Sequence, residues 1–76
     1  SYTVAFNAAN EVAVHAFLNK ECSFMDIAKI VSRTLEADWS EVPDSLDKVY
    51  EADKKARLSA SGILNSILRT GGCTYS

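Results

Sequence analysis

The most constraining pattern in the chain is a 3-4 spacing of mainly apolar residues between positions 46 and 67. Its members are Leu46, Val49, Asp53, Ala56, Ala60, Ile63 and Ile67, and Tyr50, Leu64 and Leu68 widen the stripe. This heptad spacing is typical of a helix that packs along most of its length. We therefore predict a helix over residues 46–69, about 36 Å long at 1.5 Å per residue. Ser45 is its predicted N-cap, and Gly71 and Gly72 follow its end.

A helix rich in alanine is predicted over residues 8–19, near the start of the chain. Asn7 is the predicted N-cap, because its side-chain oxygen can accept a backbone N–H of the first turn. Phe6 would then be a hydrophobic staple just before the cap. One face of this helix carries Ala9, Val12, Ala13, Ala16 and Phe17, and a second apolar line beside it carries Val14 and Leu18.

A helix is also predicted over residues 24–37, between the other two. Ser23 and Asp26 have the spacing of a capping box, with Asp in place of the usual Glu or Gln. The predicted core face of this helix carries Phe24, Ile27, Ala28, Val31, Thr34 and Leu35. Residues 39–44 should form an extended loop around Pro43. We expect Trp39 to cover the edge of the core, since a lone Trp is usually mostly buried.

Three helices with short connections predict an all-α, antiparallel bundle over residues 1–76. The 76 residues allow one small domain, and 47% of them are hydrophobic. A formal net charge of -2 and a pI near 5.2 argue against nucleic-acid or anionic-membrane partners, which need a basic face. No apolar run approaches the length of a transmembrane helix. Because the chain starts abruptly without Met, we expect it to be a fragment.

Glu11, His15 and Asp53 are the candidate site residues. Glu11 and His15 lie one helical turn apart and could contact one metal ion. Catalytic zinc typically needs three protein ligands, and no third ligand accompanies them, so we interpret them as a surface or interface pair. We expect the Asp53 carboxylate to be satisfied by Arg57, one turn later, or by donors at the start of a neighbouring helix.

The remaining charged and reactive residues suggest no chemistry. We interpret the basic residues Lys54, Lys55, Arg57 and Arg69 as a solvated face, since acidic residues interrupt them. The glycines Gly62, Gly71 and Gly72 lie at the wrong end of a helix for a phosphate-binding loop. Cys22 and Cys73 have no second Cys or His at metal-ligand spacing, and we interpret both as reduced thiols. We therefore assign no catalytic, cofactor-binding or metal-binding residue.

Several stretches together resemble one enzyme family. They are Phe-Asn-Ala-Ala-Asn-Glu-Val-Ala-Val at 6–14, Ala-Phe-Leu at 16–18, Phe-Met-Asp-Ile-Ala at 24–28, Asp-Ser-Leu at 44–46, and residues 49–57. In this order they closely resemble the C-terminal part of 1-deoxy-D-xylulose 5-phosphate reductoisomerase, over residues 6–58. The Asn-Ala-Ala-Asn-Glu string is the most specific of them.

The resemblance implies an enzyme of non-mevalonate isoprenoid biosynthesis that uses NADPH and a divalent cation, Mg or Mn. It implies that a nucleotide-binding domain comes first, a catalytic domain second and a helical domain last. This chain corresponds to the last domain alone, so it should hold no cofactor and be inactive in isolation. The family domain looks like a four-helix bundle whose first helix precedes residue 6, which leaves three helices here.

We expect this domain to brace the absent catalytic and nucleotide-binding domains of a parent enzyme, in a bacterial cytoplasm or a plastid. The alternative is a free-standing helical docking module that binds a partner helix. A bundle without one helix leaves an apolar groove, and exposed apolar patches of that kind seldom remain uncovered. We therefore also expect self-association through the first or the third helix.

Overall fold

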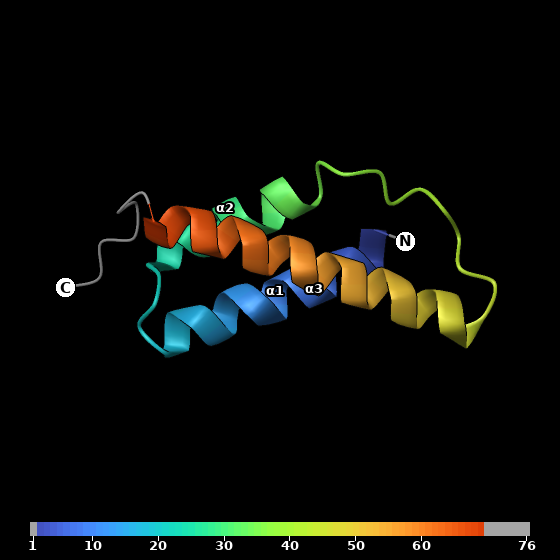
Figure 1. Ribbon diagram of the computed structural model, residues 1–76, viewed down its shortest axis with the longest axis horizontal. Helices are drawn as coiled ribbons and strands as arrows, with labels where there is room; N and C mark the ends of the chain where they lie inside the picture. The colour runs from blue at the N-terminus through green and yellow to red at the C-terminus, as the bar shows by residue number, and fades with distance from the viewer. Residues whose placement is uncertain (1, 70–76) are drawn as a thin grey trace.

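The structure is a computed structural model that describes residues 2–69, and these residues form three helices (Figure 1). α1 spans Tyr2–Leu18, α2 spans Phe24–Thr34 and α3 spans Leu46–Arg69. α2 runs back along α1, and α3 returns in the direction of α1 (Figure 1). The bundle is elongated, with extents of 44 × 20 × 16 Å. Since the described residues contain no strand, the predicted all-α class is confirmed.

The start of α1 differs from the prediction, because the helix begins at Tyr2 and not after Asn7. Asn7 is therefore an exposed residue inside the helix rather than its N-cap, and Phe6 is not a staple. The physical reason is that the buried alanine face extends further toward the N-terminus. Ala5 is fully buried and belongs to a cluster with Trp39. Burial of these additional residues outweighs the local preference of Asn for a cap position.

α1 ends in a Schellman motif centred on a lysine. Lys20 has φ of 63°, in the left-handed region that glycine usually occupies. Its N–H donates to the carbonyl oxygen of Phe17 at 3.0 Å, and the N–H of Glu21 donates to that of Ala16 at 2.8 Å. These two bonds satisfy carbonyls at the helix end. A side chain in this conformation costs about 1–2 kcal/mol, so the motif stores local strain.

Lys20→Gly should therefore stabilise the chain, by about 1 kcal/mol, because glycine adopts positive φ without steric cost. Lys54→Gly is the matched control, since Lys54 is an exposed residue inside α3. There the same replacement should destabilise by about 1 kcal/mol. Urea unfolding followed by circular dichroism measures both changes. A loss of stability in Lys20→Gly would contradict the assignment of strain to this residue.

α2 begins with the predicted capping box. The N–H and the hydroxyl of Ser23 both donate to Oδ2 of Asp26, at 3.1 and 3.0 Å. Asp26 is only 3% exposed, and its other oxygen lies 3.9 Å from Nζ of Lys29. These donors replace the water that the buried carboxylate loses.

The end of α2 differs from the prediction, because the helix stops at Thr34 and not at residue 37. The N–H groups of Glu36 and Ala37 bond carbonyls only three residues back, at 3.2 and 3.4 Å, so the chain tightens as it leaves the helix. The indole Nε1 of Trp39 then donates to the carbonyl oxygen of Thr34 at 2.9 Å. If α2 continued, this carbonyl oxygen would instead accept a backbone N–H of the next helical turn.

The core consists of two clusters along the bundle. The larger contains Ala9, Ala13, Ala16, Cys22, Ile30, Val31, Ala60, Leu64 and Ile67. The smaller contains Ala5, Ala8, Trp39 and Ala56. Leu35 packs against both clusters. Trp39 is 3% exposed, which confirms that it covers the core edge, and Nζ of Lys55 lies 4.7 Å from its ring centroid.

α3 has the predicted bounds, and its cap is confirmed because the hydroxyl of Ser45 accepts the N–H of Lys48 at 3.3 Å. The predicted stripe packs only from its middle onward. Ala56, Ala60 and Ile67 are buried as expected, and so is Leu64. The prediction that the stripe is buried is wrong at the start of the helix, because Leu46 is 86% exposed and Tyr50 is 68% exposed. The first turns of α3 extend beyond the start of α1, so no helix covers them there (Figure 1).

Candidate docking surface

Arg57 of α3 bridges two carboxylates from two helices. Its Nε donates to Oδ2 of Asp53 at 2.8 Å, which confirms the expected pair, and its Nη2 donates to Oε2 of Glu11 in α1. The hydrogen bond to Asp53, followed by that to Glu11, raises the pKa of Arg57 above its usual range. The guanidinium therefore stays charged while it joins α1 to α3. Because these groups are partly exposed, each pair contributes only about 0–1 kcal/mol.

Glu11 and His15 are both exposed, in line with their interpretation as surface residues, and Glu11 accepts its hydrogen bond from Arg57 of α3. His15 is exposed, and its Nδ1 lies 3.2 Å from Nδ2 of Asn19, one turn further along α1. Among residues 2–69, no three or more His, Cys, Asp or Glu side chains lie close enough together to hold a metal ion. Glu11 and His15 are therefore surface residues with separate partners.

The basic residues of α3 form a solvated face only in part. Lys54 and Arg69 are exposed, as expected. Arg57 is engaged by two carboxylates, and Lys55 lies over the ring of Trp39. Both of these residues thus join α3 to other parts of the fold.

Cys22 is a buried thiol whose Sγ lies 3.9 Å from the carbonyl oxygen of Ala13. It belongs to the larger core cluster, so its role there is packing. Cys73 lies outside the described residues, as do Gly71 and Gly72.

The most apolar surface feature is an open groove between α1 and α2, which we call the α1/α2 groove. It has a volume of about 360 Å³ and is lined by Phe6, Asn10, Phe24, Ile27, Ala28, Val31, Ser32 and Leu35, none of them charged. Phe6 is 47% exposed and Phe24 is 70% exposed. The ring of Phe24 packs edge-on against that of Phe17, at 5.8 Å between centroids. Exposed aromatic residues without charged neighbours are typical of interaction surfaces.

A second groove, the α1/α3 groove, lies beside the start of α1, along the first turns of α3. It has a volume of about 370 Å³ and is lined by Val4, Asn7, Leu46, Val49, Tyr50 and Asp53. Unlike the α1/α2 groove, it contains a charged residue.

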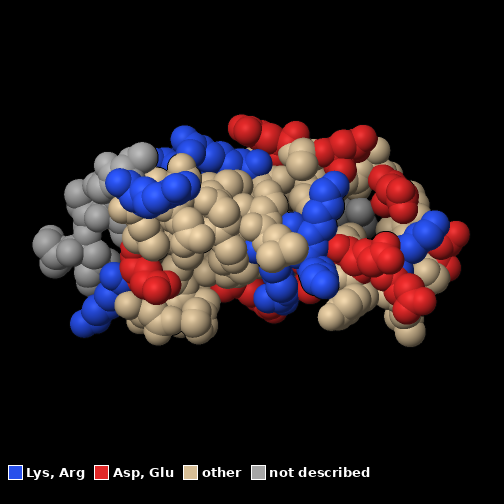
Figure 2. Space-filling model, in the orientation of Figure 1, with Lys and Arg blue, Asp and Glu red and all other residues tan. Residues whose placement is uncertain are grey.

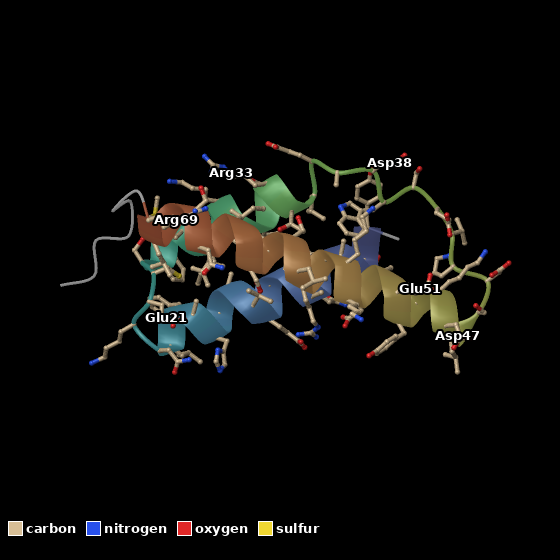
Figure 3. The ribbon with its side chains drawn as sticks, in the orientation of Figure 1. Glu21, Arg33, Asp38, Asp47, Glu51 and Arg69 are labelled. Carbon is tan, nitrogen blue, oxygen red and sulfur yellow. The ribbon has the colours of Figure 1, made fainter. Side chains whose placement is uncertain are left out.

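The acidic residues of the chain are concentrated at one end of the bundle. Residues 36–51 carry six of the ten acidic residues and one of the eight basic residues. Figure 2 shows the acidic side chains gathered at the end where α3 begins. In Figure 3, Asp38, Asp47 and Glu51 lie toward that end, while Arg33 and Arg69 lie toward the other together with the acidic Glu21. Within this acidic segment, Ser40 donates its hydroxyl and its N–H to Asp38 at 2.6 and 2.9 Å, which lowers the pKa of Asp38.

The described residues thus make up a helical domain whose distinctive surface features are apolar grooves and an acidic end. No helix within residues 2–69 is long and apolar enough to cross a membrane. These features define the class of the chain as a small, three-helix, all-α domain with apolar surface grooves.

Comparison with known proteins identifies the family. Residues 1–59 match the model of the DXP reductoisomerase C-terminal domain, so the chain belongs to that family. It is 52% identical over 68 residues to the 1-deoxy-D-xylulose 5-phosphate reductoisomerase of Endomicrobium trichonymphae, covering 87% of this chain and 18% of that protein. It is 41% identical over 73 residues to that of Trichlorobacter lovleyi, covering 96% of this chain and 18% of that protein. The resemblance therefore extends past residue 58.

A solved structure gives the same result for the fold. The 1-deoxy-D-xylulose 5-phosphate reductoisomerase from Zymomonas mobilis, in complex with NADPH, is similar with a TM-score of 0.76 and 46% identity. The similarity covers 80% of this chain and 16% of that chain. This chain thus spans about a sixth of the length of the relatives it matches.

Proposed function

We propose that this chain is the C-terminal structural domain of a 1-deoxy-D-xylulose 5-phosphate reductoisomerase, and that it braces the catalytic domain of that enzyme. The observation that carries the proposal is the family match over residues 1–59. The parent enzyme would use NADPH and a divalent cation, Mg or Mn, in non-mevalonate isoprenoid biosynthesis. It would work in a bacterial cytoplasm or a plastid. Its nucleotide-binding and catalytic domains would be the main partners of this one.

The residues described here do not fit either cofactor. A divalent cation needs several oxygen ligands, and residues 2–69 bring no such set of carboxylates together. A dinucleotide needs a glycine-rich turn at a helix N-terminus, whereas Gly62 lies inside α3. Both cofactors would therefore be held by other domains of the parent. The role of this chain would be mechanical, through its apolar grooves.

The alternative is a free-standing docking module, and the α1/α2 groove is the observation that favours it. Amphipathic helices commonly bind in grooves of this kind. The longer reading frame around the chain separates the two proposals. Nucleotide-binding and metal-binding motifs upstream of Ser1 would support the enzyme domain, and their absence there would support the docking module.

The 76-residue chain alone should not bind NADPH and should have no reductoisomerase activity, because its described residues, 2–69, hold neither a phosphate loop nor a set of metal ligands. Quenching of NADPH fluorescence during titration with the pure chain is the measurement. The full-length Zymomonas mobilis enzyme, whose structure contains NADPH, is the positive control. Saturable quenching by the 76-residue chain at micromolar concentrations would contradict the proposal.

We further propose that the chain binds itself, and that it binds neither nucleic acid nor a membrane. Its net charge of -2 and the acidic segment at residues 36–51 disfavour polyanionic partners. Self-association follows from the exposed apolar side chains along the grooves.

A further inference from the structure

The first turns of α3 expose apolar side chains that no other helix within residues 2–69 covers. Leu46 is 86% exposed and Tyr50 is 68% exposed, and together with Val49 they line the α1/α3 groove beside Val4 of α1. These turns extend beyond the start of α1, so the exposure follows from the placement of the two helices (Figure 1). A group of large apolar side chains left open in this way is typical of a contact surface.

A row of carboxylates runs along α3 beside these apolar side chains. Leu46 and Tyr50 are one helical turn apart, and Asp47 and Glu51, the residues that follow each of them, form a second row with the same spacing. Both acidic side chains are exposed, and Figure 3 shows them at the end where α3 begins. Among residues 2–69, no basic side chain forms an ion pair with either of them.

The basic residues in this part of the chain do not neutralise the acidic row. Nζ of Lys48 pairs with Oδ1 of Asp44 at 3.4 Å, and Lys55 lies over the ring of Trp39. Lys54 is exposed and follows the row, so it marks the end of the negative surface along α3. The two carboxylates of the row therefore remain available to cationic groups of a partner.

A partner surface has to match both rows. Protein interfaces combine an apolar centre with a polar rim, and here Leu46 and Tyr50 supply the centre while Asp47 and Glu51 supply the rim. Lys or Arg opposite the rim would be attracted, whereas acidic groups would be repelled. A second copy of the chain is a poor match at this surface, because a two-fold contact brings the same carboxylates together. The fitting partner is thus an apolar protein surface bordered by Lys or Arg.

The greater part of the parent protein lies outside this chain, which spans only 18% of one relative and 16% of another. A surface on the same polypeptide has a high effective concentration, so a small contact patch is enough to hold it. We propose that another domain of the parent enzyme docks on the first turns of α3. It places apolar side chains against Leu46, Val49 and Tyr50, and Lys or Arg against Asp47 and Glu51. This inference rests on the proposed function, because the parent reductoisomerase supplies the partner.

Hydroxyl-radical footprinting of Tyr50 tests the docking on the full-length parent, expressed from the reading frame that contains this chain. The dilute 76-residue chain is the reference, since Tyr50 is exposed in it. Tyr50 should be oxidised several-fold more slowly in the parent. Equal oxidation in the two proteins would overturn the docking, and so would protection of the 76-residue chain that appears as its concentration rises, because a second copy would then cover α3.

Reductoisomerase activity of the same full-length protein tests the proposed function separately. An active parent in which Tyr50 is unprotected would refute the docking alone. A parent without this activity would refute the proposed function, whatever the oxidation rate of Tyr50.

Glu51→Lys tests the acidic row, and Glu36→Lys is its matched control. Both variants make the same change of charge at an exposed residue, but Glu36 follows the end of α2 and lies outside α3. In the parent, Glu51→Lys should raise the oxidation rate of Tyr50 toward that of the 76-residue chain, because the new lysine faces the basic rim of the partner. Glu36→Lys should leave the protection unchanged.

Glu51→Gln removes the attraction without adding repulsion, so it should cause a smaller loss of protection than Glu51→Lys. It also keeps the test decisive if thermal melts of the 76-residue chain show that Glu51→Lys does not fold. Full protection of Tyr50 in the folded Glu51 variants, or an equal loss of protection in Glu36→Lys, would overturn the role of the acidic row.

Discussion

Trp39→Ala should lower the free energy of unfolding by about 3–5 kcal/mol, the usual range for removal of a large buried aromatic side chain. The indole is 3% exposed and closes the smaller core cluster over Ala5, Ala8 and Ala56. Three alanines cannot refill the volume that it leaves, so a cavity should remain. Natural domains have only about 5–15 kcal/mol of stability in total, so this variant should be largely unfolded near body temperature.

Trp39→Phe separates the packing of the ring from its hydrogen bond. It keeps most of the apolar volume and loses the bond from Nε1 to the carbonyl oxygen of Thr34, so it should cost only about 1–2 kcal/mol. Urea unfolding followed by far-ultraviolet circular dichroism measures both variants. If Trp39→Ala cost no more than Trp39→Phe, the packing of Trp39 over the alanines would not be its main contribution.

The bounds of α3 could be predicted from sequence because several local signals agree there. Ser45 supplies the cap, the heptad spacing supplies the face, and two glycines follow the last turn. The capping box of α2 was predictable for the same reason, since Ser23 and Asp26 are three residues apart. Signals of this kind act within one or two turns and need no knowledge of the rest of the chain.

The start of α1 and the end of α2 could not be predicted in this way, because Trp39 decides both. Trp39 packs beside Ala5, in the part of α1 that precedes the predicted start, and its indole N–H donates to the carbonyl of Thr34, where α2 ends. Both contacts depend on where a loop residue lies in three dimensions. Tertiary burial therefore overrode the cap preference of Asn7.

The candidate surface also shows the difference between contacts that are local in sequence and contacts that depend on the three-dimensional fold. The pair of Asp53 and Arg57 follows from i, i+4 spacing, but the bond from Arg57 to Glu11 joins residues 46 apart. Periodicity correctly placed Phe24 on the apolar face of α2, yet it cannot say whether a neighbouring helix covers that face. Phe24 was therefore assigned to the core face, although it is 70% exposed.

Ile30→Ala should destabilise the chain by about 2–5 kcal/mol, the usual cost of truncating a buried isoleucine to alanine. Ile30 is fully buried, with 0% of its surface exposed to solvent, and it is among the largest fully buried side chains. It lies in the larger core cluster, where α2 meets the other two helices. α2 has only 11 residues, which is too short to be stable without such packing.

A graded series of variants tests whether this cost comes from packing in the core. Ile30→Val removes one methylene group and should cost about 0.5–1.5 kcal/mol. Met25→Ala, in the same helix, should change stability by less than about 0.5 kcal/mol, since Met25 is 78% exposed. Chemical denaturation of the three variants gives the comparison. Equal effects for Ile30→Ala and Met25→Ala would mean that α2 does not pack through Ile30. The expected order places the stability of α2 in a few side chains that face inward and not in its exposed outer face.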